Sequence, residues 1–110
     1  PSVVSSLGVL AVEAALLPLS SGRIDLEVYF DQLTLNEANV SVNDMIKIVE
    51  AATKNMKGAE VSAVGAVGAQ GFRVSLPFDD YRQLTQSLTA AVGRRIGEAL
   101  DLLWAAVVPA

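Results

Sequence analysis

The sequence predicts a single small α+β domain, an antiparallel-type sheet with helices packed on one face, as in a ferredoxin-like sandwich. Three patterns indicate this class: an alternating apolar run that starts near Ile24, a helical apolar face after Ser41, and two short apolar runs that flank Gln70 and Gly71. A chain of 110 residues buries one core but not two. We therefore treat residues 1–110 as one domain.

The first clear element is a strand over RIDLEVYF, residues 23–30. Apolar and polar side chains alternate there, with the period of a half-buried strand. The following DQLTLNEAN, residues 31–39, predicts either a second short strand or an irregular connection, with turn chemistry from Asn36 to Asn39.

A helix is expected after Ser41, because Ser41 followed by Asp44 resembles a capping box. Apolar residues then recur at steps of three and four and give one buried face, and Gly58 is expected to end the helix as a C-cap. The face comprises Met45, Ile46, Ile48, Val49, Ala52, Thr53 and Met56.

A pair of strands and a second helix are expected next. AEVSAVGAVGA predicts a strand of small side chains, QG a tight turn at Gln70 and Gly71, and FRVSLPF a returning strand that Pro77 ends. The second helix begins near Asp79 and Asp80, where the helix dipole favours negative charge, and it buries Leu84, Leu88, Ala91 or Val92, and Ile96.

The two ends of the chain are less clearly patterned. The apolar opening is interrupted by Glu13, closed by Pro18 and preceded by no basic residue, so it predicts an element buried in the fold rather than a targeting or membrane segment. The closing IGEALDLLWAAVVPA continues the helix or turns into a last strand, and WAAVVP favours the strand.

The amino-acid composition excludes several classes of function. Hydrophobic residues make up 52% of the chain, which is high for so small a domain and indicates contacts between copies. A net charge of −4 argues against nucleic-acid binding. The chain has no cysteine and no histidine, which excludes disulfides, thiolate nucleophiles, His-based metal sites and catalytic triads. We expect no cofactor, no metal and no enzyme activity.

Several polar or glycine-rich groups resemble functional sites, but a structural interpretation is favoured for each of them. Asp79 and Asp80 are interpreted as helix-start residues, and the acidic side chains of residues 25–31 as a solvated strand face. GAVGAQG, residues 65–71, lacks the Lys-Ser/Thr of a phosphate loop and indicates close backbone approach, within the sheet or around an opening between subunits. Trp104 is interpreted as an anchor in a core or interface.

From about Ser41 onward, over residues 41–110, the chain resembles the BMC domain of bacterial microcompartment shell proteins. KIVEAATKNMKGAEVSAVG is similar to that family's helix and following strand, with a lysine, two small residues, a polar residue and a valine at residues 57–61. VGAQGFRVSLPFDDYRQLTQSLTAAV is similar to the strand, glycine-bearing loop, strand and second helix that come next.

Both ends add to the resemblance and also depart from it. RRIGEALDLLWAAVVPA is similar to the closing helix end and strand, but the family's terminal arginine is missing. SLGVLAVEA is similar to the family's first strand, in which case residues 15–40 are an insertion. Otherwise that strand lies in IDLEVYF or QLTLNE, and the chain is a rearranged version.

The resemblance implies a non-enzymatic shell subunit in the bacterial cytoplasm. Such subunits form cyclic homo-hexamers that tile into a layer, alone or with other shell subunits, and small metabolites pass through a central pore. Lys57 matches the edge lysine between neighbouring hexamers. Gly68, Ala69, Gln70 and Gly71 match the loop that rings the pore.

Two alternatives remain open. The first is another structural assembly protein, such as a virus or phage component, which would share the self-association but need not be six-fold. The second is a small ligand-binding or regulatory α+β domain, whose glycine-rich segment 65–71 would hold an anion on its backbone amides.

Overall fold

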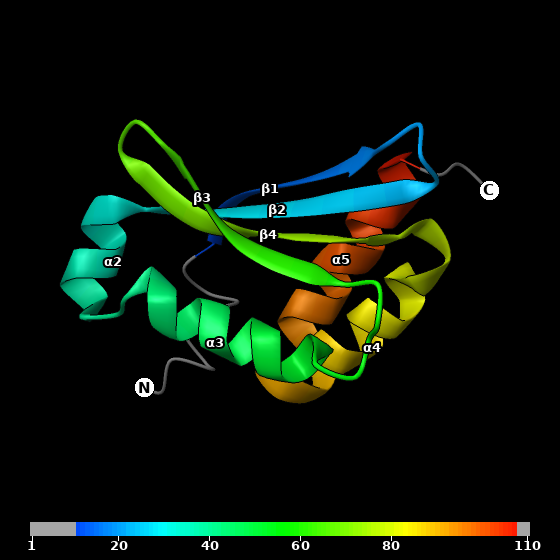
Figure 1. The fold of residues 1–110 in the computed structure, drawn as a ribbon. Coiled ribbons are helices and arrows are strands. Elements are labelled where there is room, and N and C mark those ends of the chain that lie inside the picture. Colours follow the sequence, from blue (N-terminus) through cyan, green and yellow to red (C-terminus); the bar gives the residue numbers. More distant parts are fainter. Residues whose placement is uncertain (1–10, 108–110) are drawn as a thin grey trace.

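The structure is a computed structural model that describes residues 11–107 of the chain, which fold around one sheet (Figure 1). The elements are β1 (Ala11–Pro18), β2 (Arg23–Asp31), α2 (Gln32–Ala38), α3 (Val42–Thr53), β3 (Glu60–Ala66), β4 (Ala69–Pro77), the one-turn 3₁₀ helix η1 (Phe78–Asp80), α4 (Tyr81–Val92) and α5 (Arg94–Val107).

The sheet has four strands in the order β1-β2-β4-β3, and every neighbouring pair is antiparallel. The helices lie on one side of it; in Figure 1, α3 and α4 lie below the sheet and α5 rises behind it. This arrangement confirms the predicted α+β class. From β2 to α4 the chain follows the β-α-β-β-α order of a ferredoxin-like motif, with two helices in the first connection. On the side away from β4, β2 pairs with β1, which precedes it in the chain.

The core lies between the sheet and the helices. On the two central strands every second side chain is buried, as the alternation in β2 predicted. These strands contribute Ile24, Leu26, Val28, Phe30, Phe72, Val74 and Leu76. The helices cover them with Leu35, Met45, Val49, Leu84, Leu88, Ile96 and Leu100. Since β2 is central, the segment 15–40 contributes buried residues to the core.

The prediction of a strand or irregular connection after β2 was wrong, because residues 32–38 form the helix α2. Asp31 caps this helix by accepting a hydrogen bond of 3.1 Å from the Thr34 backbone amide. Asn39 ends it in the left-handed conformation, with φ 57°, so the turn chemistry expected there is present as a C-cap.

The helix α3 was predicted correctly at its start but not at its end. Ser41 caps it, and its hydroxyl accepts a hydrogen bond of 3.2 Å from the Asp44 amide. The helix ends at Thr53, with Lys54 as C-cap, so the assignment of Gly58 as the C-cap was wrong. Gly58 instead packs closely against the end of β4, because a Cβ there would lie 2.7 Å from the ring of Pro77.

Of the two alternatives for the C-terminal run, the favoured one, a strand, was wrong, since the residues up to Val107 form the helix α5. Gly93, with φ 133°, separates α5 from α4, and Ile96 and Leu100 bury the inner face of α5. Val92 and Leu88 stay on α4 as expected. Residues 108–110 lie outside the described range, as does the part of SLGVLAVEA that precedes β1. Among the described residues, no helix is long and apolar enough to span a bilayer.

Candidate functional site

The β3–β4 hairpin contains the residues that the resemblance assigns to the pore. Ala66 pairs with Ala69, which leaves Val67 and Gly68 as a two-residue turn. Gly68 has φ 76°, a conformation that glycine adopts without strain. The prediction of a turn at Gln70 and Gly71 was therefore wrong.

Only Gly68 of the four predicted pore residues lies at the hairpin tip. Ala69, Gln70 and Gly71 belong to β4, where Gln70 is exposed and Gly71 is buried. Gly68 is held in place because its carbonyl oxygen accepts a hydrogen bond of 3.0 Å from the backbone amide of Gln32, at the start of α2. The segment 65–71 is thus mostly paired strand rather than a loop.

Gly71 is required by the sheet itself. A Cβ at this position would overlap the backbone carbonyl of Val28, and the neighbouring strand residue Tyr29 lies directly opposite Gly71 in the register. The strands β2 and β4 approach too closely here for any side chain. Close backbone approach within the sheet, one of the two interpretations of this glycine-rich segment, therefore accounts for Gly71.

Lys57 lies at the other end of β3, exposed in the turn that connects α3 to this strand. The turn is anchored, because the carbonyl oxygen of Gly58 accepts a hydrogen bond of 2.8 Å from the Arg23 guanidinium. Lys57 forms no ion pair in the part of the chain that the structure describes.

The strand β3 connects these two positions along an edge of the sheet. Within residues 11–107 it pairs only with β4, so its other backbone edge has no strand partner. From Val61 to Phe72 the sequence carries no charge. Edge strands that avoid pairing normally carry charged residues, proline or bulges. β3 has none of these after Glu60, and its edge is therefore suited to a backbone partner.

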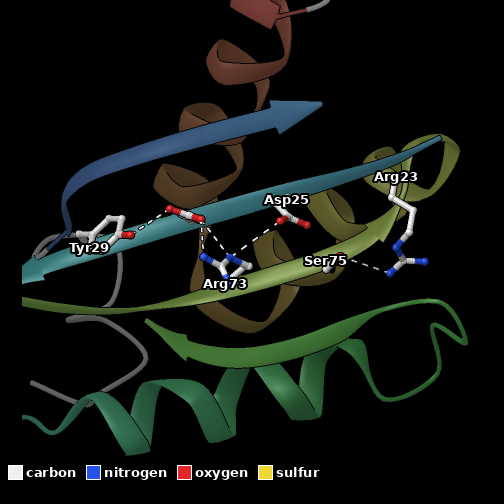
Figure 2. Close-up of polar contacts among 6 residues, drawn as sticks. Arg23, Asp25, Tyr29, Arg73 and Ser75 are labelled. Carbon is white, nitrogen blue, oxygen red and sulfur yellow. Dashed lines mark hydrogen bonds and ion pairs between the residues drawn. The ribbon is translucent and has the colours of Figure 1, made fainter. Parts of the chain in front are cut away.

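The sheet face opposite the helices carries a polar network, which Figure 2 shows around Arg73. The Arg73 Nη2 lies 2.8 Å from Glu27 Oε2, and its Nε lies 3.8 Å from Asp25 Oδ2. The Tyr29 hydroxyl donates a hydrogen bond of 2.9 Å to Glu27 Oε1. A guanidinium thus occupies the space that a cation would need between these two carboxylates.

This network sets the protonation of Glu27. The hydrogen bond from Arg73, and secondly that from Tyr29, lower the pKa of the Glu27 carboxyl. The hydrogen bond to Glu27 raises the pKa of the Tyr29 hydroxyl in turn. In the folded protein Glu27 is therefore held in its charged form.

The lowered pKa of Glu27 predicts a pH dependence of stability. The folded state binds fewer protons at this site than the unfolded state, so the network stabilises the fold above the ordinary glutamate pKa of about 4.3. This stabilisation is lost as the pH falls through the lower folded-state pKa. We expect Glu27→Gln to flatten the decline of the unfolding free energy as the pH falls below the ordinary glutamate pKa, measured by urea denaturation.

The matched control is Glu60→Gln, which removes an exposed carboxyl that makes no ion pair within the described residues. It should leave the steepness of the acid decline close to that of the parent. An equal flattening in both variants would mean that the total charge, and not the Arg73 network, governs the decline.

Two of the remaining candidate residues, Asp79 and Trp104, line a cavity next to α4 and α5. Asp79 and Asp80 lie in η1, just before α4, as predicted, although Asp80 makes no side-chain capping hydrogen bond. Trp104 packs against the core and stacks on Tyr81, which confirms its interpretation as an anchor. Sequence patterns gave no signal for this cavity, because its residues come from separate elements.

Neither a family model nor a curated protein matches the chain.

Proposed function

We propose that this chain is a structural, non-enzymatic subunit of a self-assembling protein shell of the bacterial microcompartment type. In this proposal it forms cyclic homo-hexamers with a small central pore for metabolites. The shell lies in the cytoplasm and contains this subunit alone or with other shell subunits. Lys57 lies between neighbouring hexamers, and the hairpin tip at Gly68 faces the six-fold axis.

The observation that carries the proposal is the separation of Lys57 and Gly68 by the length of β3. A subunit of a ring that tiles into a layer needs one end at the axis and the other at the perimeter. The seven residues of β3 span roughly 20 Å, at about 3.3 Å per residue. Both end positions are exposed.

The surfaces beside the hairpin tip also favour contacts between copies. Val67 is fully exposed, and Leu33 on α2 is 70% exposed. The hydrogen bond between Gln32 and Gly68 places these two elements next to each other. Large exposed apolar side chains beside an uncharged strand edge are typical of surfaces that become buried on association.

The mass and symmetry of the purified chain test the proposal, by light scattering followed by negative-stain class averages. Six-fold rings, single or tiled, would support it. Assemblies of another symmetry would favour a viral or phage type of structural protein. A discrete monomer or dimer would exclude both assembly functions.

The Lys57→Ala variant tests the edge assignment. Because Lys57 is expected only between hexamers, the variant should still form rings of the parent's mass but tile into sheets less readily. Sheet formation is measured by sedimentation and electron microscopy. Lys47→Ala, which removes an exposed lysine from α3, is the control and should tile normally. Tiling of Lys57→Ala at the parent's level would contradict the assignment.

A further inference from the structure

A cavity of about 350 Å³ lies between η1, α4 and α5, away from the hairpin tip. Its aromatic lining consists of Phe78, Tyr81 and Trp104. Trp104 is stacked on Tyr81, with ring centroids 4.9 Å apart, and lies 4.8 Å from the ring of Phe78. The volume is within the range of small-molecule sites, roughly 300–1,000 Å³.

Two hydroxyl groups of the cavity are already used within the fold. The Tyr81 hydroxyl donates a hydrogen bond of 2.8 Å to the Leu100 carbonyl, and the Thr85 hydroxyl donates one of 3.1 Å to the Tyr81 carbonyl. Burial, and secondly the Asp101 carboxylate, raise the pKa of the Tyr81 hydroxyl, which therefore stays protonated. A ligand would meet aromatic rings and the charged rim rather than these hydroxyls.

The rim of the cavity has an excess of negative charge. Asp79 and Asp101 contribute two carboxylates, while Arg82 contributes one guanidinium. None of the three takes part in an ion pair within residues 11–107. Both carboxylates are thus free to bind a cation, while the rings of the lining offer an apolar surface on which an aromatic group packs.

We propose that this cavity binds a small organic ammonium ion that carries an aromatic group. The aromatic group packs against Trp104, and the ammonium lies between the carboxylates of Asp79 and Asp101. Shape and charge are thereby recognised by different parts of the cavity. The proposal does not depend on the assembly of the chain into hexamers, since all the residues that line the cavity belong to one chain.

Trp104 is the single tryptophan of the chain, so its fluorescence reports directly on the cavity. The probes are 2-phenylethylammonium, the neutral 2-phenylethanol of nearly the same shape, and the anionic 3-phenylpropionate. We expect saturable changes with the ammonium ion, and binding about three- to tenfold weaker for the alcohol and weakest for the anion. Equal binding of ammonium ion and alcohol, or no fluorescence change with any probe, would overturn the proposal.

Charge variants test the rim. Asp101→Asn should weaken binding of the ammonium ion about two- to fivefold and leave the alcohol unchanged, whereas Arg82→Gln should strengthen ammonium binding by a similar factor. Both side chains are exposed, so the fold should tolerate these changes. Glu37→Gln, which removes one negative charge from α2, is the control. If Glu37→Gln weakened ammonium binding as much as Asp101→Asn, the total charge of the protein would explain the effect. The assignment of Asp101 to the ammonium site would then be wrong.

Discussion

Gly71→Ala is expected to lower the unfolding free energy by about 3 kcal/mol, at the upper end of what overpacking costs. The added Cβ would overlap the backbone carbonyl of Val28, which is fixed because β2 and β4 pair along their whole length. No side-chain rotation relieves this clash, so the two central strands must separate. Urea denaturation of the variant measures the loss.

Gly65→Ala is the matched control on the same hairpin. Its Cβ would lie 3.9 Å from the Ala69 carbonyl, an ordinary contact, and its stability should stay within about 0.5 kcal/mol of the parent. Comparison of the two variants also bears on the pore. If Gly71→Ala kept full stability but lost assembly, the glycine would be needed between subunits, and the explanation within the sheet would be wrong.

Phe72→Ala is expected to cost about 3–5 kcal/mol, a large part of the stability of so small a domain. Phe72 is completely buried on β4, and its ring lies 6.2 Å from that of Phe30 on β2. Truncation removes this aromatic contact and leaves a cavity that the paired strands cannot close. A melting experiment should show a lower midpoint temperature, or no cooperative transition at all.

Val67→Ala serves as the comparison for Phe72→Ala, because it shortens a side chain that the folded chain leaves fully exposed. Its unfolding free energy should change by no more than about 0.5 kcal/mol. If the two truncations cost the same, the core would not lie under β4 as described. A marked loss of assembly in Val67→Ala, without loss of stability, would instead add to the evidence for contacts at the hairpin tip.

The sequence predicted those elements whose apolar period is unambiguous. In β2 four buried residues alternate with polar ones, and in α3 the buried residues Met45, Val49 and Thr53 recur every four positions after the Ser41 cap. In such segments one face of the element packs into the core along its whole length. The apolar positions in the sequence are therefore the positions that the structure buries.

The sequence misled where a short apolar pattern fits two structures. Leu33 and Leu35 alternate as they would in a strand, but Leu35 is buried on α2 and Leu33 faces outward. The hydrogen bond that Asp31 accepts from the Thr34 amide stabilises the start of the helix. In the sequence alone, an aspartate that caps a helix cannot be distinguished from one in a turn. The pattern WAAVVP favoured a strand in the same way. The structure has the helix α5 there, because α5 packs against α4 and buries Leu100, and this packing outweighs strand propensity.

The local structure around the candidate residues was predictable in part. The resemblance assigned Lys57 and Gly68 to assembly positions, and both lie in exposed turns, but the turn itself was placed at Gln70 rather than Gly68. The Arg73 network and the cavity at Trp104 join residues from separate elements. Such contacts depend on the strand order and on the packing of α5, which no local pattern specifies.

The strand order has a kinetic consequence. β1 with β2, and β3 with β4, form hairpins between strands adjacent in the chain, whereas the central ladder pairs Arg23 with Pro77 and Asp31 with Ala69 across two helices and a strand. Hairpins form in roughly 1–10 μs, but closing a long loop costs entropy before its contacts are gained. We therefore expect the docking of one hairpin onto the other to limit the folding rate, with the ladder between β2 and β4 partly formed in the transition state.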